Sequence, residues 1–335
     1  SSGRASSDVK ERASQFIADV NQATGKSHFV GDILAGIRYS TNANSGPNGS
    51  ISSFGASTVP TPNVSGQPDF SAVASAAFRH RYDLERQDQG ALETDLLLYG
   101  AQQFQVTQAN VSLVDLTSGP RFQAFTGIFE DVTLKPFMSL GQIWVNDSPY
   151  YSSYGSGVES TALLTDRLRN TSIFLFRRHN HTNTSYLPAN AAYRGTEYAA
   201  TTVMQYALTD QVTLFGTGSG TRYETDETPS QNYILWTTGG GLSFRFTDPA
   251  FNTRLPWSIA LSYNYQWWRY DAPDPTVDPN VLRYQYDSVL NLVFSVPFDD
   301  RTTFTLSAGR AVQTATLPIY EYENNNVMIG MSWRF

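Results

Sequence analysis

The sequence has no cysteine, few charged residues and no long apolar run. Lys, Arg, Asp and Glu make up 16% of the 335 residues, against roughly 25% in ordinary soluble domains. Uninterrupted apolar runs are short, such as LLLY at 96–99, whereas a membrane-spanning helix needs about 20 apolar residues. This excludes a helical membrane protein. The net charge of −7 argues against a nucleic-acid-binding surface, and the absence of cysteine suits a chain that crosses an oxidising compartment.

Aromatic residues are abundant, at 13% of the chain, and they lie in alternating segments. In WSIALSYNYQWW at 257–268, large apolar side chains alternate with Ser, Ala, Asn and Gln. This period of two indicates a strand with one apolar and one polar face. Aromatic residues at both ends of the apolar face are typical of strands that cross a bilayer. The predicted aromatic girdle comprises Trp257, Tyr263, Tyr265, Trp267, Tyr284, Tyr286, Trp333 and Phe335.

Alternating segments repeat along the chain, and their connections fall into two kinds. Short turns that carry Asp occur at 164–167, 208–211, 246–249 and 297–301, whereas long loops occur at 41–68, 146–155, 178–197 and 272–280. Short turns on one side and long loops on the other are the asymmetry of outer-membrane barrels. The sequence therefore predicts an all-β fold, a transmembrane antiparallel up-and-down β-barrel of about 14 strands over 28–335, in the outer membrane of a Gram-negative bacterium. The predicted strands lie near 28–41, 69–84, 90–104, 109–124, 131–146, 153–165, 170–181, 197–208, 212–225, 232–247, 256–271, 283–297, 302–315 and 325–335.

The two ends of the chain differ from each other. Residues 1–27 form a separate region, in which apolar residues recur at helical spacing from Val9 to Val20 and Gly25 can end the helix. Because one such helix is marginal alone, we expect it to end a periplasmic helical region or to plug the barrel. The last segment alternates up to a terminal Phe335, so we expect it to pair with the first strand and to face lipid.

Three segments resemble a known family. FVGDILAGIRYSTNANSGP at 29–47 is similar to the first barrel strand of a proteobacterial family in which periplasmic tetratricopeptide helices precede a barrel. LTSGPRFQAF at 116–125 and LKPFMSLGQIWVNDSPYYSSYGSG at 134–157 resemble alphaproteobacterial members. The group resembles the surface lipoprotein assembly modifiers (Slam-like), so the resemblance implies a role in surface display. It extends over nearly all of 28–335, although the tetratricopeptide part is absent, and it brings no active-site residues.

Ionisable side chains take the polar parity of the predicted strands. Such groups are costly on a lipid face, so we expect them inside the barrel. One interpretation is a polar conduit, and the other is a ladder of ion pairs that fills the interior. Because both signs are interleaved, a strongly ion-selective pore with rings of one sign is not expected. The lumen-lining candidates are Asp32, Arg38, Arg79, Arg81, Asp83, Glu93, Asp95, Asp115, Arg121, Lys135, Glu159, Arg245, Arg283, Asp287 and Arg334.

Little in the sequence predicts catalysis or metal binding. His179 and His181 form a His-x-His pair, but no third ligand stands out nearby, so we expect no metal and no other cofactor. His80 has the parity of the lipid face, where a lipase could place it, yet no G-x-S-x-G motif occurs. We therefore predict no catalytic residues and no enzyme. Three interpretations of the loop at 41–68 stay open: it constricts the lumen, it contacts a client or sugar outside, or it is a mobile surface loop. At 272–280 simple loop packing is favoured over an acidic calcium site.

Three functions fit these features. The leading prediction is a translocation channel that exports or helps display a macromolecule, such as a surface protein or lipoprotein. The alternatives are an exopolysaccharide-export channel or a passive diffusion porin, because fourteen strands can enclose water, and a structural or adhesive surface barrel. The expected partners are outer-membrane lipid and lipopolysaccharide, the barrel-assembly machinery, and an exported protein or polysaccharide client, with no nucleic acid. The oligomeric state is open.

Overall fold

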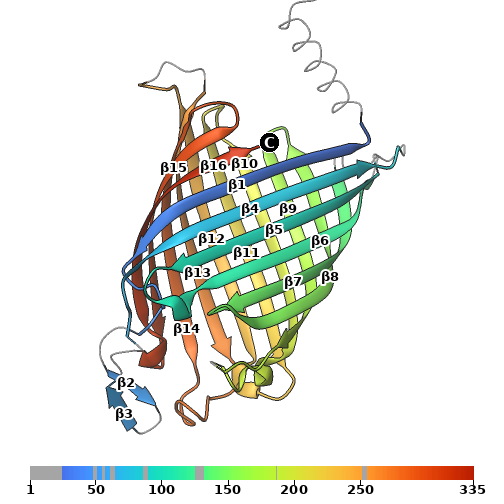
Figure 1. Cartoon of the computed structure of the whole chain (residues 1–335). Coiled ribbons are helices and arrows are strands. Elements are labelled where there is room, and N and C mark those ends of the chain that lie inside the picture. Colours follow the sequence, from blue (N-terminus) through green and yellow to red (C-terminus); the bar gives the residue numbers. More distant parts are fainter. Residues whose placement is uncertain are drawn as a thin grey trace, which may run out of the picture.

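Fourteen long antiparallel strands form a closed barrel (Figure 1). The computed structural model describes residues 25–47, 51–54, 57–60, 65–85, 90–124, 132–185, 187–250 and 255–335. Within these residues each barrel strand pairs with its neighbours along the chain, and the first pairs with the last. This confirms the predicted fold class. The barrel strands are β1 (Ser27–Ser40), β4 (Asp69–Asp83), β5 (Ala91–Gln103), β6 (Val111–Ala124), β7 (Val132–Val145), β8 (Ser148–Thr165), β9 (Leu168–His181), β10 (Gly195–Ala207), β11 (Val212–Thr225), β12 (Tyr233–Phe246), β13 (Trp257–Tyr270), β14 (Tyr284–Pro297), β15 (Thr302–Ala315) and β16 (Tyr322–Arg334).

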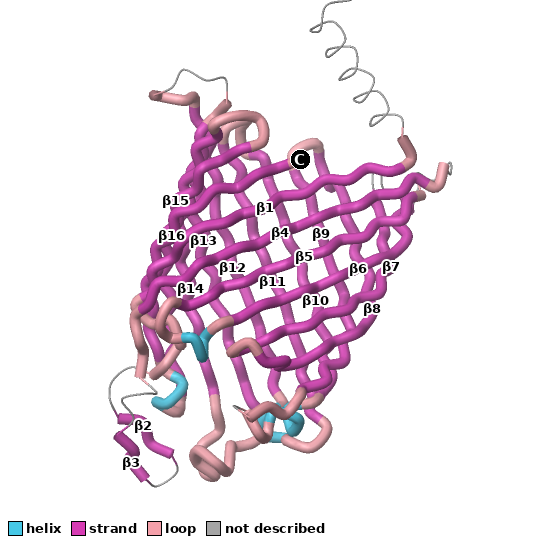
Figure 2. Tube along the Cα trace, in the orientation of Figure 1, coloured by secondary structure: helices cyan, strands magenta, loops and turns pink. Residues whose placement is uncertain are grey.

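The connections differ at the two ends of the barrel. The start of β1 and the end of β16 lie at one rim, and the short turns at 166–167, 208–211 and 298–301 lie there too (Figure 2). The opposite rim carries the longest connections, at 41–68, 182–194 and 271–283, and also the two-residue turn at 146–147. The structural elements at this rim are a small hairpin of β2 (Ile51–Phe54) and β3 (Ser57–Pro60) and the short 3-10 turns η1 (Thr107–Ala109), η2 (Asn190–Tyr193), η3 (Pro229–Gln231) and η4 (Pro318–Tyr320). In outer-membrane barrels the rim with short turns faces the periplasm, so we call these the periplasmic and outer rims. The predicted N-terminal helix lies outside the described residues.

The two faces of the barrel wall differ in chemistry. Leu242, Leu261 and Leu292 lie side by side on β12, β13 and β14, and each is about 40% exposed on the outside. The opposite parity carries the ionisable residues predicted to line the lumen, among them the buried Lys135. Strands of 13 to 18 residues are long enough to cross a bilayer at a tilt, which needs about 9–11 residues. Among the described residues no helix is long and apolar enough to cross a membrane.

The C-terminal residue closes the barrel. The Phe335 N–H donates to the Gly31 carbonyl at 3.0 Å, and the Gly31 N–H donates to the Phe335 carbonyl at 3.1 Å. The Phe335 ring lies 5.8 Å from the Phe29 ring and 5.9 Å from the Phe78 ring. The pairing of the last strand with the first is therefore as expected, and the terminal ring packs on the outer face of β1 and β4.

The prediction of a long loop at 146–155 is wrong. Asn146 and Asp147 form a two-residue turn with φ of 50° and 56°, and β8 begins at Ser148. Two positive φ values are the hairpin turn that matches the twist of the flanking strands, and Asn and Asp tolerate them. Pro149 lies where the register shifts beside Trp144, and a bulge is a place where a strand accepts proline.

This turn gives a prediction for stability. Replacing Asp147 by Val is expected to lower the free energy of unfolding by about 1–2 kcal/mol, because a β-branched residue is strained at positive φ. Asp147→Gly is the matched control and should leave it nearly unchanged, since glycine adopts that φ freely. Equilibrium unfolding in urea with lipid vesicles measures both variants. Equal losses for Val and Gly would show that the turn geometry is not what stabilises this hairpin.

Candidate functional site: the barrel lumen

The register places the predicted lumen residues on one face of the wall. Arg79 lies opposite Asp95, Lys135 opposite Glu159, and Asp32 opposite Arg334, and all have the parity opposite to the exposed leucines. The other candidates share this inward parity, namely Arg38, Arg81, Asp83, Glu93, Asp115, Arg121, Arg245, Arg283 and Asp287.

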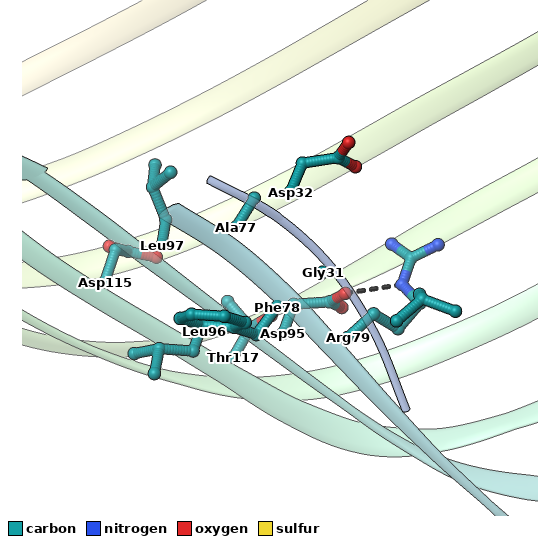
Figure 3. A pocket seen from close by; sticks show the side chains of 11 residues that line it. Gly31, Asp32, Ala77, Phe78, Arg79, Asp95, Leu96, Leu97, Asp115 and Thr117 are labelled. Atoms are coloured by element: carbon teal, nitrogen blue, oxygen red, sulfur yellow. Dashed lines mark hydrogen bonds and ion pairs between the residues drawn. The ribbon is translucent and has the colours of Figure 1, made fainter. Parts of the chain in front are cut away.

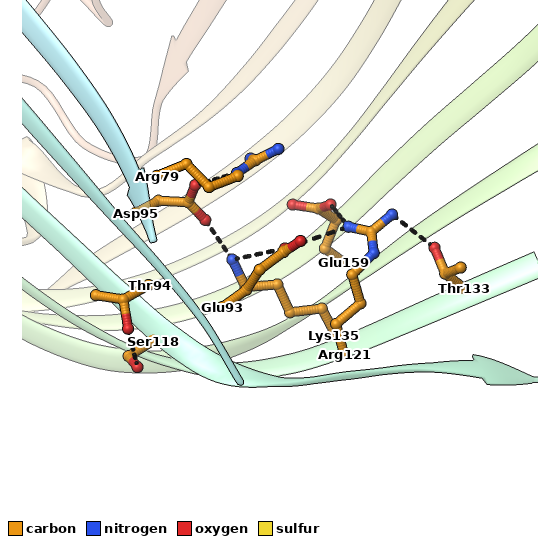
Figure 4. Close-up of polar contacts among 9 residues, drawn as sticks. All are labelled: Arg79, Glu93, Thr94, Asp95, Ser118, Arg121, Thr133, Lys135 and Glu159. Atoms are coloured by element: carbon orange, nitrogen blue, oxygen red, sulfur yellow. Dashed lines mark hydrogen bonds and ion pairs between the residues drawn. The ribbon is translucent and has the colours of Figure 1, made fainter. Parts of the chain in front are cut away.

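Six of these residues form one polar network on β4 to β8, which we call the charged network (Figure 4). Arg79 Nε lies 2.5 Å from Asp95 Oδ1, and Lys135 Nζ contacts the other oxygen of the same carboxylate. Three cations face three carboxylates, so the network as a whole is neutral. Its remaining contacts are Lys135 Nζ to Glu93 at 3.6 Å, and Arg121 Nη1 to Glu93 at 3.4 Å and to Glu159 at 3.3 Å.

Exposure to water changes across the charged network. The side chains of Lys135 and Glu93 are 2% and 5% exposed, and that of Arg79 is 50% exposed. Buried charges are tolerated only when they are paired and hydrogen-bonded, which explains why Lys135 touches two carboxylates. The network is therefore anchored in the wall at Lys135 and reaches the lumen at Arg79. Both sequence interpretations, ion-pair ladder and polar lining, describe a part of it.

A recess of about 310 Å³ lies beside the charged network. Figure 3 shows Arg79 and Asp95 paired along it, with Asp32 and Asp115 at its sides. Asp32 accepts a hydrogen bond from Arg334 Nε at 2.9 Å across the seam between β1 and β16. The recess can hold water or a small polar group on the inner wall.

The opposite wall is polar but carries few charges. Ser262 on β13 lies beside Asn291 on β14, and Asn291 lies beside Gly309 on β15. Thr237 and Gln266 continue the same inward row on β12 and β13. These side chains donate and accept hydrogen bonds without net charge. The lumen thus has a charged side on β1 and β4–β9 and a largely neutral hydrogen-bonding side on β10–β15.

The sequence analysis did not assign Arg177 and Glu197 to the lumen, although both have the inward parity. The predicted residue Arg283 is sequestered at the outer rim. Arg177 lies 3.0 Å from Asp115, and Glu197 lies 3.4 Å from His179. In IFLFRRHNH at 173–181 apolar residues occupy both parities, so the alternation does not show which arginine points inward. Arg283 has the inward parity but is only 6% exposed. Its guanidinium stacks over the Tyr270 ring at 3.4 Å, so it ties the outer rim together and does not meet a solute.

The histidines do not assemble a recognised catalytic or metal site. Among the described residues no group of three or more His, Cys, Asp or Glu could hold a metal ion. His181 Nδ1 is 3.2 Å from the Asn190 side-chain oxygen. On the outer face, His80 Nε2 lies 2.8 Å from Ser27 Oγ. Within the part of the chain that is described, no carboxylate contacts His80, so a group that would orient the imidazole is missing there.

The predicted girdle residues all lie on the outer face. Trp257 and Trp267 stand near the two ends of β13, where a girdle is expected. Tyr263 lies midway along the strand and therefore not at a girdle position. Its hydroxyl is 3.1 Å from Ser288 Oγ. Tyr265 lies in the interior of β13, where its ring stacks on that of Tyr286 at 6.5 Å. The other four lie near the strand ends, with Tyr284 and Tyr286 at the outer rim and Trp333 and Phe335 at the periplasmic rim.

A closed barrel with an apolar outside and a polar inside fits a lipid bilayer. Only a closed barrel or a helix leaves no backbone group unpaired in hydrocarbon, and aromatic side chains at the strand ends mark the two interfaces. The chain is an integral outer-membrane β-barrel. The three longest connections all lie at one rim, which agrees with that location.

Comparisons with known proteins add no family. No family model and no curated protein matches the chain. Among solved structures it is similar to OmpT, an outer-membrane protein of Vibrio cholerae in a trimer form, with a TM-score of 0.49 and 9% identity over 92% of this chain and 99% of that one. It is also similar to the channel DcaP of Acinetobacter baumannii, with a TM-score of 0.48 and 8% identity over 92% of this chain and 97% of that one. A Pseudomonas aeruginosa FadL homologue is similar with a TM-score of 0.48 and 10% identity over 92% of this chain and 89% of that one. Likenesses at this level carry no conclusion about function, and the tetratricopeptide-linked family stays a prediction.

Proposed function

We propose that the barrel is a channel through which hydrophilic solutes cross the outer membrane. The observation that carries this is the exposure of inward charges: the side chains of Arg334, Asp32 and Arg79 are 73%, 56% and 50% exposed although they face away from lipid. Water therefore reaches the inner wall at the seam and beside the charged network. A lumen lined by paired charges on one side and by neutral hydrogen-bonding groups on the other favours solutes without a dominant charge.

Uncharged solutes give the direct test of this proposal. Liposomes that contain the purified barrel are expected to swell in an isotonic solution of a small neutral sugar, because the sugar enters with water. The rate should fall as the sugar becomes larger, and liposomes with the same amount of heat-unfolded protein are the control. Swelling no faster than in the control would contradict a diffusion channel and would leave a filled lumen.

Export or display of a macromolecule is the second candidate function. The resemblance of residues 29–47, 116–125 and 134–157 to barrels with upstream periplasmic helices supports it. In this proposal residues 1–27 belong to the delivery apparatus for a surface protein, a lipoprotein or a polysaccharide. A full-length chain that does not conduct, together with a chain lacking residues 1–27 that does, would favour this candidate over the diffusion channel.

We also propose that the Phe335 ring helps the barrel to assemble in the membrane. Phe335 follows β16, and its ring packs against Trp333 at 4.7 Å and against Phe29. Phe335→Ala is expected to lower the fraction of barrel assembled in cells several-fold, whereas Phe335→Tyr should assemble normally because it keeps the ring. Heat-modifiable gel mobility of outer-membrane fractions measures both. Normal assembly of Phe335→Ala would show that the terminal ring is dispensable for insertion and closure.

A further inference from the structure

A second cavity lies inside the barrel at the outer rim, away from the charged network. It has a volume of about 290 Å³ and is enclosed by residues of β8 to β12 and of the turns η2 and η3. We call it the mouth pocket. Five tyrosines and two histidines line it, together with the carboxylate of Glu197 and the amide of Gln231. No lysine or arginine is among its lining residues in the described part of the chain.

The aromatic rings of the mouth pocket are held in place by one another. Tyr151 lies 4.7 Å from His179, and Tyr223 meets the same imidazole edge-on at 5.5 Å. Tyr223 and Tyr233 stack at 5.4 Å. Their β-strand positions and mutual contacts fix these rings before any ligand arrives. A fixed aromatic lining loses little conformational freedom on binding.

Some of the polar atoms in the mouth pocket already have partners. The Tyr223 hydroxyl donates to the Tyr193 carbonyl at 2.6 Å. The Gln231 amide donates to Asp274 at 3.0 Å and accepts from Arg283 at 2.9 Å. These groups are committed to the protein. What remains for a ligand is the ring surface, the other tyrosine hydroxyls and the Glu197 carboxylate.

The charge around the mouth pocket is negative. Glu197 is the formally charged lining residue. Behind the lining, Arg283 donates to the Gln231 side chain at 2.9 Å and stacks on Tyr270, and Arg177 is paired with Asp115 at 3.0 Å. His179 Nε2 is buried and lies 3.4 Å from Glu197 without a hydrogen bond. Aromatic faces carry negative potential and attract cations, most strongly where water is excluded. A carboxylate beside several rings therefore selects for positive charge with an apolar surface.

We propose that the mouth pocket binds a small organic cation, a substituted ammonium group, at the outer side of the lumen. The ring faces would contact its alkyl groups and Glu197 its charge, as in other aromatic cages. The volume limits the ligand to a small head group, because it lies at the lower end of typical ligand pockets of about 300–1,000 Å³. Binding at this site can be measured whether or not the lumen conducts, so its test does not depend on the proposed channel function.

Calorimetric titration of the folded, detergent-solubilised full chain with choline tests the proposal. The matched probe is 3,3-dimethylbutan-1-ol (called dimethylbutanol below), because it has the shape of choline with carbon in place of the charged nitrogen. We expect choline to bind at least about tenfold more tightly than dimethylbutanol. Equal binding of the two, or no binding of choline, would overturn the proposal. Tighter binding of a neutral hexose than of choline would instead make the pocket a saccharide site.

Single substitutions test separately how much the Glu197 charge and the aromatic rings contribute to binding. Glu197→Gln keeps the shape and should weaken choline binding about tenfold, whereas Asp210→Asn, which removes an exposed carboxylate at the opposite rim, should not change it. Tyr151→Leu should weaken binding and Tyr151→Phe should retain it, since a phenyl face suffices. The Tyr151 pair also serves if Glu197→Gln does not fold, as judged by heat-modifiable mobility. Unchanged binding in Glu197→Gln or in Tyr151→Leu would contradict the proposal.

Discussion

Leu261→Arg is expected to lower the free energy of unfolding by about 2–4 kcal/mol, the effect of a charged side chain near the bilayer midplane. Leu261 lies on the outer face in the middle of β13, between Leu242 and Leu292 on the neighbouring strands. An arginine there must bring its charge into hydrocarbon or bend toward an interface. Equilibrium unfolding of the barrel from lipid vesicles in denaturant measures the loss.

The next residue along the chain provides the control. Ser262 lies beside Asn291 on the inner face, so Ser262→Arg places the same charge in water. Its expected change in unfolding free energy is small. Similar losses for Leu261→Arg and Ser262→Arg would contradict the assignment of the two faces, and with it the membrane orientation of every strand in register with β13.

Lys135→Met is expected to destabilise the barrel by about 3–5 kcal/mol, because removing one partner of a buried ion pair leaves an uncompensated charge. Lys135 contacts both Glu93 and Asp95, and Met fills a similar volume without charge. The charged network would then have two cations and three carboxylates. We therefore also expect a shift of the reversal potential toward cation selectivity in bilayers with a salt gradient.

A second substitution tests whether this loss comes from the charge. Lys135→Met combined with Glu93→Gln removes one charge of each sign, so the double variant should be more stable than the sum of the two single losses predicts. A double-mutant cycle in the same unfolding assay gives the coupling. Additive losses, or a double variant that remains cation-selective, would show that the charged network does not act as one neutral unit.

Local alternation was sufficient to predict most of the wall. In residues 257–267 large apolar and small side chains alternate throughout, and in 284–296 they alternate except at Ser288, Val289 and Val293. The structure gives one strand for each segment. The prediction failed at residues 146–155, where Ser, Pro and Gly suggested a loop and where Tyr151 and Tyr154 fall on opposite parities, so no clear alternation marks the start of β8. An Asn-Asp turn with two positive φ values needs no further residues.

The assignment of residues to the lumen was predictable in part, for a physical reason. Parity along a strand decides the face, so Asp32 and Arg334 could be assigned inward from the sequence. Whether a side chain then meets water depends on the register between strands and on what packs over it. Lys135 and Arg283 have the inward parity but are buried, and only the positions of Glu93 and Tyr270 on neighbouring strands explain why. The mouth pocket depends in the same way on five strands coming together.

Single-channel recording in a planar bilayer tests the central claim most directly. The purified full chain and a chain lacking residues 1–27 are compared in a gradient of potassium chloride. A water-filled lumen with balanced charges predicts steady openings of the full chain and a reversal potential close to zero. Silence of both chains would contradict an open channel and would leave a barrel whose interior is closed by its own ion pairs.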